Sequence, residues 1–150
     1  MVERFEKFSF ALFEITRYWY KISAEEMKPY GLKGPHATYL STLYKQEDGI
    51  TAPQLADLCG KDKADVSRSM AIMEEKGLVI KEAAGKNKYR GLLKLTDKGR
   101  EAAEHVRERI VVAVKLAGRG LSDEQRENFY AALSLITYNM RDLNQNGLPE

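Results

Sequence analysis

The chain has 150 residues, of which 43% are hydrophobic and 31% charged, a composition that excludes a disordered chain and is enough to bury a sizeable core. Its formal net charge is only +2, yet residues 61–100 carry 11 Lys/Arg and 6 Asp/Glu, so positive charge is concentrated in the middle of the chain. A single cysteine excludes an internal disulfide, and because we find neither a signal peptide nor an apolar run of about 20 residues, we expect a cytoplasmic protein that does not enter a membrane.

Two long helices are predicted near the ends of the chain. In the first, over about residues 2–27, apolar side chains recur every three or four positions: Phe5, Phe8, Leu12, Ile15, Trp19 and Ile22. The last helix begins at a capping box formed by Ser122 and Gln125, and it repeats the same spacing at Phe129, Leu133, Ile136, Met140 and Leu143. These stripes either cover the chain's own core or pair with the same helices of a second subunit.

Shorter elements are predicted between these two helices. A helix over residues 35–45 is followed by a minimal strand at residues 49–50. Thr51 and Gln54 form a second capping box, which begins a short helix that Gly60 ends.

The next helix is predicted over about residues 62–76, and its buried line is formed by Val66, Met70 and Met73. Two apolar runs, at residues 78–80 and 92–95, then predict a β-hairpin. Thr96 follows the hairpin and caps a further long helix.

A short helix, a tight turn, a second helix and a hairpin form the winged helix-turn-helix arrangement. The face of the second helix opposite its buried line carries small residues, a hydroxyl and cations: Lys63, Ala64, Ser67, Arg68 and Ala71. Such a face suits the major groove, which is about 12 Å wide, and an arginine can form two hydrogen bonds to guanine there. The hairpin carries cations near its tip, which either lie along a phosphate backbone or belong to a solvated loop without DNA contact.

The stretch that runs from GLKGPHATYL through LADL, VSR and MEEKGLV to LLKLTDKG resembles the MarR family of bacterial and archaeal transcriptional regulators. The resemblance extends over essentially the whole chain. It implies a mainly α fold with a small β-hairpin, with a winged helix-turn-helix module at residues 32–100 and dimerisation helices at residues 1–31 and 101–150. It also implies a homodimer that binds a pseudo-palindromic site in double-stranded DNA, usually as a repressor that a small aromatic or anionic effector releases.

Carried over to this sequence, the family's polar pair on the recognition helix corresponds to Ser67 and Arg68. Asn87 stands where the family usually has a wing aspartate, and Arg90 comes one position later than the family's arginine. The wing lysines therefore replace an oriented arginine with less directional charge. The predicted DNA-binding residues are Lys61, Lys63, Ala64, Ser67, Arg68, Lys86, Asn87, Lys88 and Arg90.

In the family, the effector crevice lies between the dimerisation helices and the winged module. Aromatic walls with a few polar groups suit a planar aromatic ligand. The alternative is that the aromatic rings found here are core and hinge packing. The residues that fall in the elements lining this crevice are Trp19, Tyr20, Tyr30, His36 and Tyr39.

Other chemistry receives little support from the sequence. Cys59 is either a buried structural thiol or a redox sensor, and His105 with Glu101 and Glu108 forms either a solvated salt-bridge strip or a metal-binding face. We expect neither a metal nor a cofactor, and no enzyme, because we find no phosphate loop, nucleophile elbow or Cys/His cluster. The remaining alternative is a winged-helix module that docks an acidic protein through its basic wing and binds no specific DNA.

Overall fold

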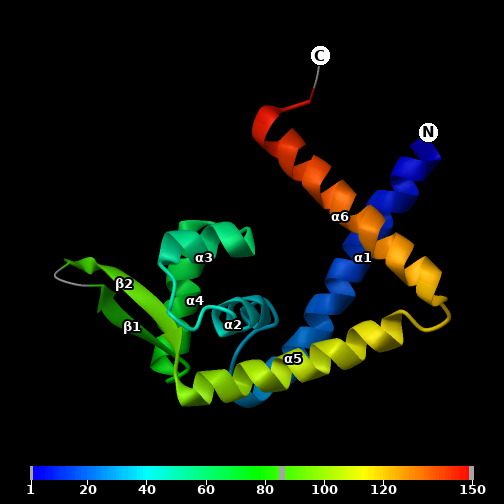
Figure 1. Cartoon of the computed structure of the whole chain (residues 1–150). Helices are drawn as coiled ribbons and strands as arrows, with labels where there is room; N and C mark the ends of the chain where they lie inside the picture. The colour runs from blue at the N-terminus through cyan, green and yellow to red at the C-terminus, as the bar shows by residue number, and fades with distance from the viewer. Residues whose placement is uncertain (1, 85–86, 149–150) are drawn as a thin grey trace. The chain divides into compact units, whose positions relative to one another are not determined.

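The computed structural model of the protein describes residues 2–84 and 87–148, without the side chains of residues 84 and 87–90 (Figure 1). The chain divides into two compact units, Met1–Val111 and Val112–Glu150. The predicted fold class, mainly α with a small β-hairpin, is confirmed by the order of the elements: α1 (Val2–Met27), the 3₁₀-helix η1 (Lys28–Tyr30), α2 (His36–Tyr44), α3 (Ala52–Cys59), α4 (Lys63–Glu75), β1 (Val79–Ala84), β2 (Asn87–Leu95), α5 (Asp97–Ala117) and α6 (Asp123–Asn146).

The helix boundaries follow local chemistry. Thr51 and Ser122 each begin a helix with a complete capping box, in which the hydroxyl accepts from the backbone N–H three residues on and the glutamine there accepts in return from the N-cap N–H. Gly31 and Gly60 follow η1 and α3 in the left-handed conformation, which glycine adopts without the steric penalty of a Cβ atom. Both capping boxes were predicted from the sequence, and both are confirmed.

The two strands form an antiparallel hairpin. Its register runs from Val79 opposite Leu95 to Ala83 opposite Gly91, and an irregularity follows between Ala83 and Ala84. Ile50 adds a third, one-residue strand, since its N–H donates to the Leu93 carbonyl at 3.1 Å and its carbonyl accepts from the Leu93 N–H at 2.8 Å. The minimal strand predicted at residues 49–50 is therefore confirmed as a single bridge at Ile50.

One hydrophobic core holds the first unit together. Figure 1 shows α2, α3 and α4 packed against one another, with the hairpin extending from them. Buried side chains come from α2, α3, α4, the hairpin and the first half of α5: among them are Tyr39, Leu40, Leu43, Leu55, Val66, Met73, Leu78, Leu93 and Val106. The core also receives Met27 from the end of α1, whereas the apolar residues in the first half of α1 remain outside it.

Helix α5 is attached to the hairpin at its first turn. The hydroxyl of Thr96 accepts from the N–H of Gly99 at 3.0 Å and donates to the carbonyl of Gly77 at 2.6 Å. Gly99 is buried, and a Cβ atom at this position would overlap the carbonyl oxygen of Leu78. The predicted cap at Thr96 is thus confirmed, and the absence of a side chain at Gly99 permits the close approach.

The second unit contains the end of α5, a turn and α6. In this turn, Arg126 donates from its guanidinium to the Gly118 carbonyl at 3.3 Å. Helix α6, all of whose residues the structure describes, has no buried side chain, although it carries the predicted apolar stripe. No helix in the described ranges 2–84 and 87–148 combines the length and hydropathy required to cross a bilayer.

Candidate nucleic-acid interface

A tight turn joins α3 to α4. Gly60 adopts a φ of 60°, and the carboxylate of Asp62 then caps α4 by accepting from the N–H of Asp65 at 2.7 Å. Because glycine permits the left-handed conformation and aspartate is a favoured N-cap, the three residues 60–62 between the two helices are enough to redirect the chain. The turn places α3 behind α4, the geometry in which a first helix braces a second one for groove reading.

The two faces of α4 differ in the predicted way. Val66, Met70 and Met73 are buried in the core, and Ser69 is buried beside them. The face opposite them is exposed and consists of Lys63, Ala64, Ser67, Arg68 and Ala71. The Arg68 side chain has 69% of its surface exposed, so its guanidinium is available to a partner.

Asp65 was not predicted to be part of this site. Its carboxylate accepts from the buried hydroxyl of Tyr39 at 2.5 Å and lies 3.8 Å from the guanidinium of Arg68. Burial is the largest cause of the raised pKa of Tyr39, and the hydrogen bond to Asp65 adds to it, so the phenol stays protonated and donates. No pattern in the sequence indicates this contact, because Tyr39 and Asp65 are 26 residues apart.

Part of the predicted wing contact lies outside the described structure. Lys86 is not among the described residues, and of Asn87, Lys88 and Arg90 only the backbone in β2 is described. At the base of the hairpin, Lys94 pairs with Glu82 at 2.8 Å. The DNA contacts predicted for the wing therefore stay predictions, as does that of the half-exposed Lys61 before α4.

A hollow of about 370 Å³ opens between α1, α2 and α5 in the first unit. Trp19 forms an aromatic wall, and Lys45 and Arg107 bring two cations to it. The hydroxyl oxygen of Ser41 is buried at this hollow and has no hydrogen-bond partner among the described residues. The other lining residues are Ala37, Thr38, Thr42, Ile110 and Val111. An aromatic wall, two cations and an unpaired hydroxyl suit a small planar anion.

Of the five residues predicted to contact an effector, only Trp19 lines this hollow. Tyr39 is completely buried in the core, and His36 is also buried, where its Nδ1 accepts from the Lys33 N–H at 3.0 Å. Burial lowers the pKa of His36 and so favours the neutral ring that this acceptor role requires. Tyr20 is exposed on α1.

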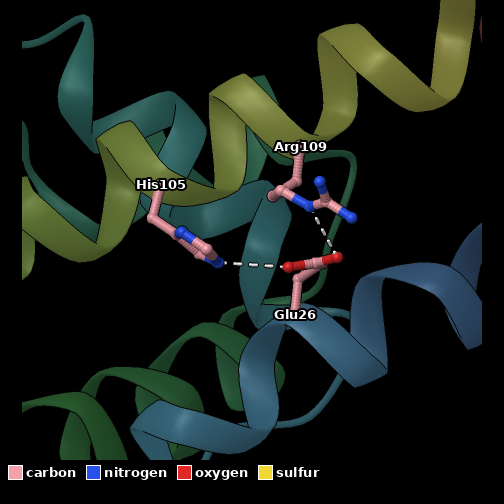
Figure 2. Close-up of polar contacts among 3 residues, drawn as sticks. All are labelled: Glu26, His105 and Arg109. Carbon is pink, nitrogen blue, oxygen red and sulfur yellow. Dashed lines mark hydrogen bonds and ion pairs between the residues drawn. The ribbon is translucent and has the colours of Figure 1, made fainter.

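Tyr30, the fifth, packs beside an ionic cluster that joins α1 to α5. Its ring centroid lies 6.1 Å from that of His105. Figure 2 shows Glu26 of α1 between two side chains of α5, with His105 Nε2 at 3.1 Å and Arg109 Nε at 2.9 Å from its two carboxylate oxygens. The hydrogen bond from Arg109 is the largest cause of the lowered pKa of Glu26.

The remaining candidates have local partners. His105 contacts Glu26 across two helices, and the described residues contain no group of three or more His, Cys, Asp or Glu side chains arranged to hold a metal. Cys59 is half-buried, with its sulfur 3.4 Å from the Thr42 hydroxyl oxygen, and burial raises the pKa of its thiol. A raised pKa disfavours the reactive thiolate, which argues against a redox sensor.

A braced helix with an exposed cationic face, followed by a two-stranded wing, defines this molecule as a winged helix-turn-helix protein. The sequence profile of the MarR family matches residues 30–88. The resemblance predicted from the sequence is therefore confirmed over these residues.

Solved structures with the same fold cover most of the chain. A MarR transcriptional regulator from Methanosarcina mazei Go1 is 21% identical, with a TM-score of 0.84 over 92% of this chain and 99% of that one. A putative MarR family regulator from Listeria monocytogenes, complexed with a 26mer DNA, is 24% identical, with a TM-score of 0.82 over 93% and 95%. MepR from S. aureus, also solved with DNA, is 19% identical, with a TM-score of 0.80 over 89% and 97%.

Proposed function

We propose that this protein is a homodimeric transcriptional regulator that binds a pseudo-palindromic site in double-stranded DNA. The exposed face of α4 is the observation that carries this proposal, because small side chains, a hydroxyl and cations project there from a helix that α3 braces. Two proteins of the same fold, from L. monocytogenes and S. aureus, were solved with DNA, which supports a shared mode of binding.

Direct reading is assigned to Arg68 and Ser67, and phosphate contact to Lys61, Lys63 and the wing residues Lys86, Asn87, Lys88 and Arg90. Ala64 permits close approach of the helix to the base edges. Positive charge on α4 and the wing attracts the duplex irrespective of sequence, whereas the forked guanidinium of Arg68 distinguishes guanine by its two acceptors. Affinity and specificity are thus carried by different side chains.

The DNA-binding proposal is tested by fluorescence anisotropy with a duplex selected from a random pool by the wild-type protein. Arg68→Ala is expected to weaken binding to the selected duplex by about 5- to 150-fold, so that this affinity comes closer to the affinity for a scrambled duplex. Lys63→Ala is expected to weaken binding to both duplexes alike. It should also reduce the slope of log affinity against log salt concentration by about 1. Lys28→Ala is the control, since this exposed lysine of η1 pairs with Glu25 of α1 and does not belong to the exposed face of α4.

Two results would contradict the proposal. If Arg68→Ala binds the selected duplex as the wild type does, then α4 is not the reading helix. If the wild type binds no duplex even at low salt, the winged-helix protein-interaction module becomes the better interpretation of this fold.

The effector site is assigned to the hollow between α1, α2 and α5, and the ligand class to small planar aromatic anions. Trp19 offers a ring to stack on, while Lys45, Arg107 and the Ser41 hydroxyl can bind a carboxylate. Because the hollow contacts both α1 and α2, a bound anion can shift the winged module relative to α1 and so release DNA. Release on binding of a small molecule makes repression the expected mode of action.

Trp19 is the chain's single tryptophan, so fluorescence excited at wavelengths that tyrosine does not absorb reports on the surroundings of Trp19. Titration with benzoate is expected to change Trp19 emission and to lower DNA affinity, whereas neutral benzamide is the matched control and should do neither. Arg107→Gln is expected to weaken benzoate binding. If benzoate and benzamide change the emission equally, the hollow does not select an anion and the assignment is wrong.

A further inference from the structure

We propose that Tyr39 and Asp65 are positioning residues that hold the Arg68 guanidinium for base reading and restrain it from sequence-independent phosphate contact. This inference rests on the proposed DNA-binding function of α4. It goes beyond that function because it assigns specificity to one side chain in the core and to one acidic side chain, neither of which is a cation of the binding face.

The carboxylate of Asp65 is fixed from the core. Tyr39 of α2 is 0% exposed, and its hydroxyl donates to Asp65 Oδ2 at 2.5 Å. A hydroxyl bonded to a carboxylate at this distance is a strong, charge-assisted interaction, and a buried phenol without a partner would be costly. The position of the carboxylate is therefore set by the packing of α2 against α4, and not by the surface rotamer preferences of an isolated aspartate.

The second oxygen of the same carboxylate faces Arg68. Asp65 Oδ1 lies 3.8 Å from a terminal nitrogen of that guanidinium, three residues further along α4 and thus on the same side of the helix. At this distance the two groups attract each other without a direct hydrogen bond. All five N–H donors of Arg68 consequently remain available to a base, while the neighbouring negative charge limits where the guanidinium can go.

A negative charge on a DNA-facing helix needs a reason, because it opposes attraction to phosphate. Asp65 reduces the electrostatic attraction between Arg68 and the phosphates of every duplex alike. It also restricts the guanidinium to the orientation that contact with a guanine requires. The first effect leaves the ratio of specific to non-specific affinity unchanged, and the second effect raises it. Asp62 offers a comparison within the same helix: it is also an acid of the N-terminal region, but its carboxylate caps the Asp65 N–H.

The test measures the ratio of two dissociation constants, for the duplex selected by the wild type and for its scrambled counterpart. Asp65→Asn keeps an acceptor for Tyr39 and removes the charge. The variant is expected to bind the scrambled duplex more tightly and to lower the ratio by about 10-fold, within the range that one bidentate arginine–guanine contact supplies. Tyr39→Phe should also lower the ratio, although it changes no charge, and its thermal unfolding curve shows whether the fold is kept.

Asp62→Asn is the matched control, since it makes the same change of charge on the same helix and asparagine also caps well. This variant is expected to bind both duplexes more tightly and to leave the ratio of the two dissociation constants unchanged. In an Arg68→Ala background, Asp65→Asn should have no further effect on the ratio, because its action passes through Arg68.

The inference is overturned if Asp65→Asn keeps the wild-type ratio, if Asp62→Asn lowers the ratio equally, or if the effect of Asp65→Asn persists without Arg68. These outcomes leave the DNA-binding function intact. A wild-type protein that binds neither duplex would instead overturn the proposed function, and this inference with it.

Discussion

Glu26 ties α1 to α5 through two side chains that lie four residues apart on one helix. One oxygen of its carboxylate contacts His105 and the other contacts Arg109, and its side chain is 22% exposed. The adjacent Glu25 is 67% exposed and pairs with Lys28, one turn away on the surface. Neighbouring residues of the same type thus differ in environment, and this difference allows a controlled test of how the two helices are joined.

We expect Glu26→Gln to lower the free energy of unfolding at neutral pH by about 1 kcal/mol, because it removes a charge that Arg109 stabilises. The pKa of Glu26 is lowered in the folded state, so this stabilisation is present above the unfolded value of 4.5 and is lost as pH falls through the folded pKa. Urea unfolding between pH 7 and pH 3 measures it. The difference between wild type and variant should shrink toward zero at acidic pH, while Glu25→Gln should have almost no effect at any pH.

A constant difference between wild type and Glu26→Gln across this range would show that the carboxylate acts through packing and not through its charge. An effect of Glu25→Gln as large as that of Glu26→Gln would show that the surface charge of α1 matters in general. Either result would contradict the interpretation that an ionic link between α1 and α5 stabilises the fold.

At the scale of single residues, the sequence predicted surfaces better than partners. Ser67 and Arg68 were placed on the exposed face of α4 because the periodicity of Val66, Met70 and Met73 fixes which side is buried. Periodicity contains no information on contacts between elements. It therefore did not indicate that Asp65 bonds to Tyr39, and it left open whether Tyr39 was a ligand-facing ring or, as its burial shows, part of the core.

At the scale of elements, capping chemistry made boundaries predictable. Caps and glycines act within four residues along the chain, so a sequence displays them directly. The close approach of α5 to the hairpin was not predictable in this way, because it depends on the distance between Gly99 and the Leu78 carbonyl, two groups joined only through the whole hairpin. A glycine near the start of a helix gives no sign of what lies opposite it.

Gly99→Ala tests this approach. In an open helix the change would be slightly stabilising, since alanine is the better helix former. Here the new methyl group would overlap the Leu78 carbonyl, and we expect a loss of about 2–3 kcal/mol in the free energy of unfolding, measured by urea denaturation. Gly60→Ala is the comparison: nothing lies within 4 Å of its would-be Cβ, so only the left-handed backbone penalty of about 1 kcal/mol applies.

If Gly99→Ala were as stable as the wild type, the first turn of α5 would not pack closely against Leu78, which lies between α4 and β1. A loss confined to Gly60→Ala would assign the cost to backbone conformation alone. The comparison thus separates a steric contact between elements from a conformational preference within one.

At the scale of the whole molecule, the apolar surface exceeds what one chain buries. Phe5, Leu12 and Ile15, which belong to the predicted stripe of α1, are 68%, 41% and 60% exposed. On α6, Phe129, Ile136 and Met140 are exposed although they repeat at helical spacing. Exposed apolar stripes of this length are typical of an interface, and a twofold dimer is the commonest arrangement that covers them. The sequence left open whether the stripes cover the chain's own core, and the exposure of both favours a second subunit.

Ile136→Glu is expected to convert the proposed dimer to a monomer, because it places a charge in the apolar stripe of α6. Sedimentation velocity at micromolar concentration measures the change. Since α6 buries no side chain in the described chain, the variant should keep its far-ultraviolet circular dichroism. Ala131→Glu is the matched control: it adds the same charge to an exposed position about half a turn from the stripe, and it should remain dimeric.

The same pair of variants connects association to function. Two reading helices that bind one palindrome together gain an effective concentration that a single helix lacks, so a monomer should lose roughly 10²- to 10⁴-fold in affinity for the selected duplex. Binding to a single half-site should change little, because each winged module retains its own α4. If Ile136→Glu were monomeric and still bound the full palindrome as tightly as Ala131→Glu, then one module alone would account for recognition, and the terminal helices would need another role.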